Sequence, residues 1–290
     1  MTGSNNLKEN IIYGIFLVLG LITVGFVLLI SVYLIIAGLP AIREIGLIDF
    51  LFGTTWASTA AEPKFGILPF ILTSVYGTAG AVIIAIPVGF FTAVYVSKIA
   101  PKWVRTWVTG AVNLLAGIPS VVYGLVGMMV LIPGIRIVFD VPDGATLLAA
   151  IIVLSIMILP YIISVSVTSL DAVPKSYEDA SLALGANHIE TYFRVSVPAA
   201  KSGIAAAVVL GVGRAIGEAM AVIMVSGNVA NMPGIFESVR FLTSAVASEM
   251  SYSSGLQREA LFSIALVLFL FIMLINACLN FFIKRGQKLH

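Results

Sequence analysis

Long stretches without a charged side chain are the strongest constraint on this sequence. Five windows contain no Asp, Glu, Lys or Arg: residues 10–42, 65–97, 106–135, 144–170 and 260–283. A sixth window, 202–236, is interrupted only by Arg214 and Glu218. About 20 apolar residues cross the hydrocarbon of a bilayer as a helix, and charged groups are costly there. The windows therefore predict an all-α integral membrane protein with about six transmembrane helices.

The limits of the windows place the spans. We expect them at about 11–37, 67–97, 107–133, 145–170, 202–228 and 260–283, within a single transmembrane domain covering residues 1–290. The composition agrees, because only 10% of the residues are charged, against about 25% in soluble proteins. The net charge is only +2 and Lys and Arg form no cluster, which argues against nucleic acid as a partner. We expect the chain to contact the lipid bilayer instead. The two histidines lie outside the windows, so we expect no metal and no cofactor.

The distribution of Lys and Arg predicts the orientation. The N-terminus, the loops 98–105 and 171–201 and the C-terminus hold ten of them, whereas the opposite loops hold five. Because positive charge is enriched on the cytoplasmic side, both termini are expected in the cytoplasm. On the other side, the segments 39–64 and 229–258 are long enough to cover an outer opening or to be ordinary surface loops.

The predicted cytoplasmic loop, residues 171–200, carries strong local signals. Ser176 and Asp179 have the spacing of a capping box, and Gly185 can end that helix in a left-handed turn. Asn187 with Glu190 then starts a second short helix, which Pro198 limits. The pattern predicts two short helices joined by a fixed elbow. Such an element either docks a cytoplasmic partner or lies on the lipid surface.

This loop also carries a family resemblance. DASLALGANHIETYFRVSVP resembles the EAA loop of the permease subunits of bacterial ABC importers, in which Glu-Ala-Ala is followed at fixed spacing by Gly and by Ile-x-Leu-Pro. The matching positions are Asp179, Ala180, Ser181, Gly185, Val195, Val197 and Pro198. The resemblance implies a type I ABC importer permease fold, in which this loop is the coupling helix that fits a groove on the ATP-binding subunit.

Three further segments narrow the resemblance to the permeases of phosphate importers. They are Ile67 to Pro101, AGIPSVVYGLVG at 116–127, and GRAIGEAMAVIMVSGN at 213–228, and the last is similar to the PstC-type subunit. The chain departs from that family at Ala219, where threonine is usual. The resemblance implies a bacterial inner-membrane complex with a second, PstA-type permease, two ATP-binding subunits and a periplasmic phosphate-binding protein.

The chain has no G-x-x-x-x-G-K-[ST] motif, so we expect ATP hydrolysis on a separate subunit and no catalytic activity here. Three alternatives stay open. The first is a permease for another oxyanion, such as sulfate, molybdate or phosphonate. The second is a signalling subunit that conducts nothing, which has no use for a charged residue at mid-membrane. The third, an intramembrane enzyme, is disfavoured because the sequence suggests no nucleophile with its base.

The two charges of the sixth window raise the question of a substrate path. On a helix with about 100° per residue, six residues share one face: Arg214, Gly217, Glu218, Ala221, Val225 and Asn228. Gly213 and Gly217 form a G-x-x-x-G pair that would let another helix approach. In one interpretation Arg214 and Glu218 pair and brace the bundle. In the other, the guanidinium of Arg214 binds an anion in transit and Glu218 keeps that binding weak.

The segment AGIPSVVYGLVG gives a second candidate. Pro119 removes a hydrogen bond from its helix, which a membrane tolerates only where the freed groups face protein or water. The hydroxyls of Ser120 and Tyr123 either bond to the backbone of a kinked helix or contribute to the path. Gly124 and Gly127 are expected at close helix contacts.

Overall fold

The computed structural model describes the backbone of residues 3–287 and, within it, the side chains of residues 9–278 and of Phe281. The first half of the chain contains α1 Gly3–Ile45, α2 Leu47–Phe52, β1 Trp56–Ala57, β2 Lys64–Phe65, α3 Leu68–Val94, α4 Lys102–Gly117, α5 Ser120–Val126 and α6 Ile132–Phe139. The second half contains α7 Leu147–Asp171, α8 Lys175–Ala183, α9 His188–Thr191, α10 Val197–Ala199, α11 Lys201–Gly217, α12 Met220–Val225, α13 Leu242–Glu249 and α14 Gly255–Gln287. Turns of π-helix at Tyr95–Ile99, Gly127–Leu131 and Tyr192–Ser196 extend α3, join α5 to α6 and join α9 to α10.

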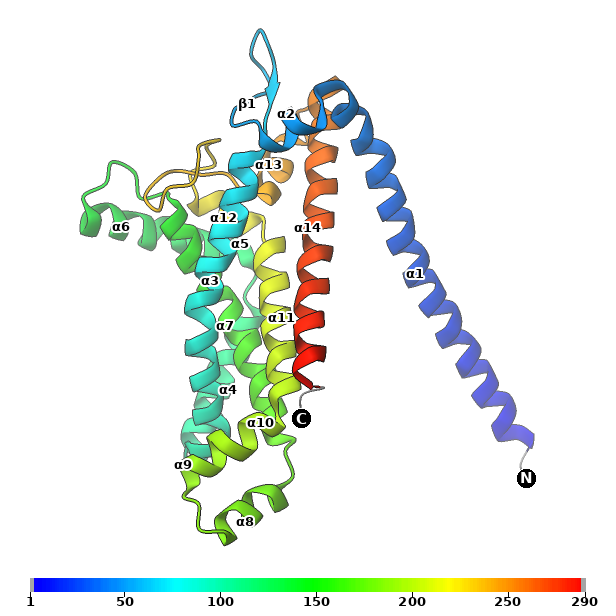
Figure 1. Ribbon diagram of the computed structural model, residues 1–290, viewed down its shortest axis with the longest axis vertical. Helices are drawn as coiled ribbons and strands as arrows, with labels where there is room; N and C mark the ends of the chain where they lie inside the picture. Colours follow the sequence, from blue (N-terminus) through cyan, green and yellow to red (C-terminus); the bar gives the residue numbers. More distant parts are fainter. Residues whose placement is uncertain (1–2, 288–290) are drawn as a thin grey trace.

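The helices form an upright bundle around α7 (Figure 1). Of the hydrophobic window of α7, 61% is buried, more than in any other candidate span among the described residues. Its buried side chains include Leu154, Met157, Ile158 and Ile162, which belong to the largest core cluster. Because no residue of α7 from Leu147 to Leu170 is charged, the helix can be surrounded on several sides by others. The bundle therefore assembles around an apolar central helix.

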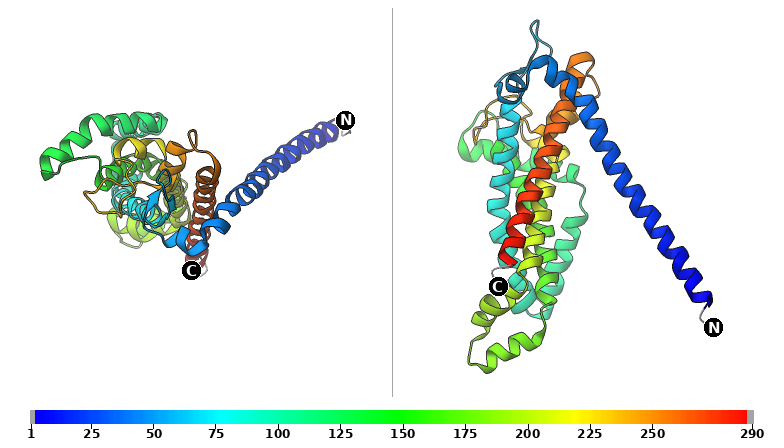
Figure 2. Two further views of the ribbon diagram at one scale, coloured as in Figure 1. Left: turned by 90° about the horizontal axis from the view of Figure 1, so that it is seen from above. Right: turned by 45° about the vertical axis from the view of Figure 1, so that its right-hand side comes forward.

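The predicted fold class is confirmed. Within residues 3–287, five helices are long and apolar enough to cross a membrane, or six if the bent pair His188–Ala199 and Lys201–Gly217 counts as one span. The described start of α1 and the described end of α14 both lie toward the end of the bundle that carries α8 and α9 (Figures 1 and 2). This arrangement agrees with an even number of crossings.

Two of the expected spans are not single helices. The third, predicted at 107–133, ends as α4 at Gly117 and resumes at Ser120 in a segment that turns away from the bundle axis (Figure 1). The sixth, predicted at 202–228, ends as α11 at Gly217 and resumes as α12 at Met220. The absence of charged residues does not reveal such breaks, because the residues at a break can be as apolar as those of a helix.

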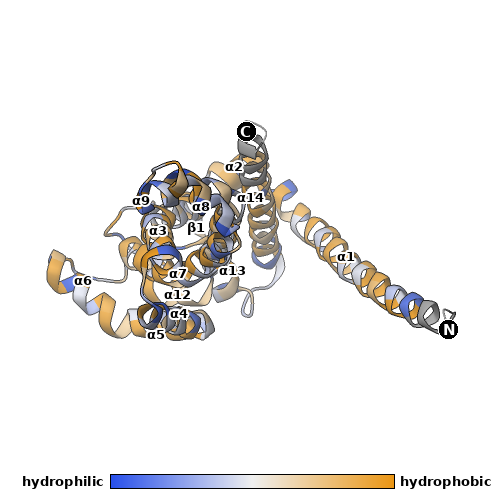
Figure 3. Cartoon of the chain, turned by 90° about the horizontal axis from the view of Figure 1, so that it is seen from below, coloured by the Kyte–Doolittle hydropathy of each residue, from blue (hydrophilic) through white to orange (hydrophobic). Residues whose placement is uncertain are grey.

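The helix α1 stands apart from the bundle along most of its length (Figure 2). None of its hydrophobic window is buried, and hydrophobic residues line it throughout (Figure 3). It meets α14 near Gly38, whose carbonyl accepts a hydrogen bond from the Ser263 hydroxyl, and the rings of Tyr33 and Phe262 meet edge to face at 5.6 Å. An apolar surface of this length suits the interior of a bilayer.

The end of the bundle opposite α8 has a core of its own. Apolar side chains from α2, the β1–β2 hairpin, α3, α13 and α14 meet there, among them Phe50, Trp56, Phe70, Leu242 and Leu261. The two long segments predicted at 39–64 and 229–258 thus pack together as a folded cap. A partly buried ion pair between Arg240 and Glu249 lies within it, and Nε1 of Trp56 donates to Glu249 Oε2 at 3.3 Å.

Candidate functional site

The two broken helices end in the same way. The residue after α4, Ile118, has φ −71° and ψ 128°, and the residue after α11, Glu218, has the same pair of angles. Both helices start with lysine near the end that carries α8, and they have 16 and 17 residues. Each therefore rises by about 25 Å, at 1.5 Å per residue, before the chain turns extended. Both breaks lie well inside the bundle, at similar depth.

The segments that follow the breaks, α5 and α12, pack against each other. A Cβ built on Gly124 would lie 2.9 Å from the Cα of Ala221 and 2.8 Å from Met224 Sδ. A Cβ on Gly127 would lie 2.7 Å from Val225 Cγ1. The expected close packing at these two glycines is confirmed, and it brings the two breaks together.

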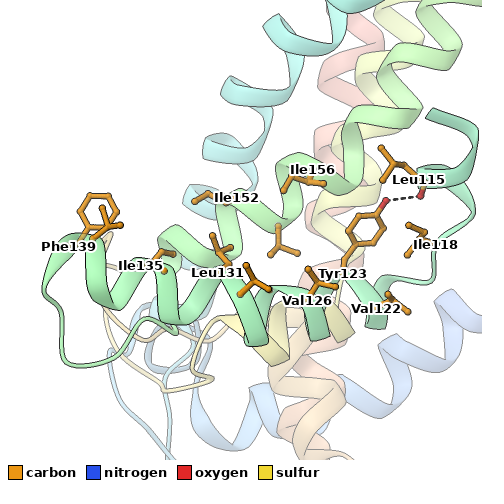
Figure 4. A pocket seen from close by; sticks show the side chains of 15 residues that line it. Leu115, Ile118, Val122, Tyr123, Val126, Leu131, Ile135, Phe139, Ile152 and Ile156 are labelled. Carbon is orange, nitrogen blue, oxygen red and sulfur yellow. Dashed lines mark hydrogen bonds between the residues drawn. The ribbon is translucent and has the colours of Figure 1, made fainter. Parts of the chain in front are cut away.

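Two tyrosines replace the hydrogen bonds that the break in α4 removes. In a continuous helix the amides of residues 119 and 120 would bond to the carbonyls of Leu115 and Ala116, but Pro119 has no N–H. The hydroxyl of Tyr123 donates to the Leu115 carbonyl at 2.7 Å, as Figure 4 shows, and that of Tyr161 donates to the Ala116 carbonyl at 3.1 Å. The break is thereby stabilised without water.

Tyr123 lines an apolar groove between α5, α6 and α7 (Figure 4). The other side chains of this groove are hydrocarbon, including Leu115, Val126, Ile152 and Ile156. With its hydroxyl bonded to the backbone, Tyr123 matches the first of its two interpretations, a kinked helix whose hydroxyl serves the main chain. Ser120 is the first residue of α5 and is half-buried at the break.

Arg214 lies on the last turn of α11, three residues before the break. Its guanidinium stacks over the ring of Tyr161, with Cζ 4.4 Å from the ring centroid. Its Nε is buried and has no hydrogen-bond partner in the protein. A buried donor without an acceptor costs about 1–3 kcal/mol, and more when it is charged. An anion or water that reaches this nitrogen would remove the cost.

Glu218 does not pair with Arg214. Among the described residues no ion pair joins them. The carboxylate instead accepts a hydrogen bond from the Ala221 amide at 3.0 Å, and the Glu218 carbonyl accepts one from Thr243 Oγ1 at 2.6 Å. The carboxylate thus satisfies one of the free N–H groups at the start of α12. The interpretation in which the two charges brace the bundle through each other is wrong in this structure.

The continuous polar face predicted for residues 214–228 does not exist. Ala221 and Val225 are fully buried, and Asn228 lies beyond α12 in the left-handed region with φ 53°. The reason is the break at Glu218, because the 100° periodicity holds only within one unbroken helix. The Asn228 carbonyl accepts from Nε and Nη2 of Arg240 at 2.9 and 2.8 Å, whereas its buried Oδ1 has no partner.

The glycines of α11 also differ from expectation. A Cβ on Gly213 or Gly217 would have no neighbour within 4 Å, so the described part of this chain packs nothing against them. One close approach to α7 occurs at Gly203, where a Cβ would overlap Ser169 Oγ. Another occurs at Gly211, where a Cβ would lie 3.0 Å from Ile162 Cγ1. The face of α11 with Gly213 and Gly217 is left open, and Arg214 lies beside it.

The loop at the end of the bundle is the predicted helical elbow. Gly185 has φ +92°, and Asn187 and Glu190 form both bonds of a capping box, at 2.9 and 3.1 Å. The capping box predicted at Ser176 is wrong, because α8 already begins at Lys175 after Pro174, which places Ser176 inside the helix. The hydroxyls of Ser181 and Thr191 lie 3.0 Å apart and connect the two arms.

The elbow presents apolar side chains outward. Leu184 is 90% exposed, Tyr177 55% and Ile189 53%. Of the residues that match the EAA pattern, Asp179, Ala180, Gly185 and Pro198 are exposed, and Ser181, Val195 and Val197 are half-buried. Exposed large apolar groups on a short, rigid element are typical of a protein contact.

A partly buried ion pair fixes the elbow to the bundle, and no local sequence signal predicts it. Nζ of Lys98, in the turn that extends α3, lies 2.6 Å from Glu178 Oε1, and the two side chains are 10% and 18% exposed. The Ser196 hydroxyl donates to the same oxygen at 2.8 Å. Burial raises the pKa of Glu178, but hydrogen bonds from Lys98 and Ser196 and the charge of Lys98 lower it by more, so the pKa lies below its usual value.

Helices broken inside a bundle, an open face beside Arg214 and an exposed elbow at one end suit a class of protein, the membrane permease that contacts a partner at that end. The chain belongs to the family described as binding-protein-dependent transport system inner membrane component, which matches residues 85–287. It is thus a permease subunit of an ABC transporter.

Proteins of similar sequence support the same family, and solved structures of ABC transporters have the same fold. The chain is 40% identical to the probable ABC transporter permease protein YqgH of Bacillus subtilis over 88% of this chain and 86% of that protein. It is 33% identical to the phosphate transport system permease protein PstC of Pasteurella multocida, over 83% of this chain and 81% of that one. A bacterial alginate ABC transporter chain has the same fold, with a TM-score of 0.63 and 15% identity over 96% of both chains. A chain of the MetNI methionine ABC transporter has a TM-score of 0.60 and 19% sequence identity, over 76% of this chain and 95% of that one.

The ion pair predicts a pH dependence. Because the pKa of Glu178 is lower in the folded protein, the stabilisation is complete above the usual glutamate pKa of about 4.3 and is lost as the pH falls below it. Thermal unfolding of the purified permease should therefore show a steeper loss of stability on acidification for the native chain than for Glu178→Gln. Lys98→Met should remove most of this loss, because without the hydrogen bond and the charge of Lys98 the burial of Glu178 raises its pKa back toward the usual value or above it. The same pH profile for the native chain and Glu178→Gln would contradict the assignment.

Proposed function

We propose that this chain is the PstC-type permease of an ATP-driven importer of inorganic phosphate, in which Arg214 meets the anion on its path. The observation that carries the proposal is the buried Nε of Arg214, which has no acceptor in the protein although its helix has an open face. A guanidinium matches phosphate oxygens and keeps its charge in an apolar setting. The 33% identity to a PstC permease over most of both chains supports phosphate as the anion.

The proposed path runs along the open face of α11. Gly213 and Gly217 leave room beside Arg214 that nothing in the described chain fills. The second, PstA-type permease would close this path from the other side. Glu218 and Asn228 flank it, Glu218 by holding the start of α12 and Asn228 through its free Oδ1. Ser120 and Tyr123 belong to the facing break, where they shape the path through the backbone of α4 and α5.

The proposed assembly contains two permeases, two ATP-binding subunits and a periplasmic phosphate-binding protein in the bacterial inner membrane. The elbow of α8 and α9 would be the coupling helix, with Leu184 and Tyr177 inserted in a groove of the ATP-binding subunit. The excess of Lys and Arg in the loops at that end, ten against five, supports a cytoplasmic location for the elbow and for both termini. The folded cap with Trp56 and Arg240 would then face the binding protein.

Replacing Arg214 tests the path. In the complete complex, reconstituted in vesicles, Arg214→Gln should lower ATP-driven uptake of radiolabelled phosphate by at least about tenfold, because one charged hydrogen bond contributes more than about 1.4 kcal/mol. Arg214→Lys should be intermediate, since lysine lacks the planar fork. Glu218→Gln keeps an acceptor for Ala221, so the complex should assemble normally and its uptake reports the part of Glu218 in the path. Uptake at the native rate by Arg214→Gln would contradict the proposal, and stronger competition by sulfate or molybdate than by unlabelled phosphate would reassign the anion.

Replacing Gly185 tests the coupling. At φ +92° a β-branched residue is strained, whereas asparagine adopts left-handed angles more readily. We expect Gly185→Val to lower uptake per ATP hydrolysed by roughly tenfold while the chain still folds, and Gly185→Asn to stay within about threefold of the native complex. A complex with Gly185→Val that imports phosphate with the native ratio would remove the coupling role from this elbow.

A further inference from the structure

Tyr161 connects the two breaks. It lies on α7 directly after Pro160, which is buried within that helix. Its hydroxyl donates to the Ala116 carbonyl at the end of α4, and its ring carries the guanidinium of Arg214 from α11, at 4.4 Å. One side chain on the central helix thus contacts the ends of both broken helices.

The contact depends on how closely α11 approaches α7. Gly211 lies one turn before Arg214, and its missing side chain lets the backbone of α11 rest against Ile162, the residue after Tyr161. Ile162 is only 1% exposed, so its position is fixed by the core. The packing of α11 on α7 therefore brings the backbone of Arg214 close to Tyr161.

The geometry of stacking leaves the donors of Arg214 free. A guanidinium packs on an aromatic ring through its flat face, whereas its N–H groups point outward in its own plane. Glu218 directs its carboxylate at Ala221, so this acid does not occupy those N–H groups. Nε, which is buried without a partner, keeps its capacity to donate. The ring thus orients the cation without using any of the bonds that an oxyanion needs.

We infer that Tyr161 is a positioning residue for transport. Its ring holds the guanidinium of Arg214 with the N–H edge turned to the anion, and its hydroxyl holds the end of α4 in register with α11. This inference rests on the proposed function of Arg214. It assigns separate tasks to the two parts of one side chain, which substitution can separate.

The test compares Tyr161→Phe with Tyr161→Leu in the complete reconstituted complex, with ATP-driven uptake of inorganic phosphate as the readout. Phenylalanine keeps the ring and loses only the bond to Ala116, so uptake should stay within about threefold of native. Leucine removes the ring, and uptake should fall by roughly 3- to 30-fold more than with phenylalanine. Assembly and basal ATP hydrolysis are measured alongside, and Tyr161→Met replaces the leucine variant if that variant does not assemble.

A second experiment tests whether Tyr161 affects transport through its contact with Arg214. In an Arg214→Lys background the planar cation is gone, so Tyr161→Leu should cost much less than it does in the native chain. Equal losses in both backgrounds, equal losses with phenylalanine and leucine, or native uptake by Tyr161→Leu would each overturn the inference. A native complex that takes up no phosphate would overturn the proposed function itself, which is a different result.

Discussion

Backbone groups freed inside a bilayer have no water to bond, and this constraint governs the centre of the molecule. Two helices stop near mid-depth, and side chains bond to backbone groups at each break. Tyr123 and Tyr161 supply hydroxyls to the last carbonyls of α4, while the carboxylate of Glu218 accepts the Ala221 amide at the start of α12. The breaks are therefore built parts of the fold, and they bring irregular backbone and polar groups to one place.

Arg214 lies at the same place and is half-buried, with its Nε fully enclosed. Arg214 would be costly in an apolar bundle, and no carboxylate of the described chain neutralises it. The ring of Tyr161 offsets part of the cost through its π face. The buried Nε of Arg214 has no acceptor in the protein, which is why we propose that the transported anion binds there. At the far end, the pair of Lys98 and Glu178 ties the exposed elbow to α3, which packs along α7.

The features that depend on neighbouring residues or on the bilayer could be predicted from the sequence. Windows without charge predicted the helices, and Gly185 and Asn187 predicted the elbow, because a left-handed turn and a capping box depend on nearby residues alone. The start of α8 was missed by two residues because the N-cap is Pro174 and not Ser176. The prediction of one continuous helix face around Arg214 was wrong beyond Gly217, because no proline in the sequence marks the break in the helix there. The role of Tyr161 depends on the contact of α7 with α11, which no single segment encodes.

The central claim is that the open face of α11 beside Arg214 lines a water-filled path that phosphate enters. Single cysteines at Gly213 and Gly217 test it in the assembled complex, with Cys278→Ser to remove the exposed native thiol. A cysteine at Ala215, which is 3% exposed, is the control on the buried side of the same helix. The account predicts that a membrane-impermeant thiol reagent labels the first two and not the third, and that phosphate delivered during turnover slows the labelling. Resistance of both glycine positions in an active complex would contradict it.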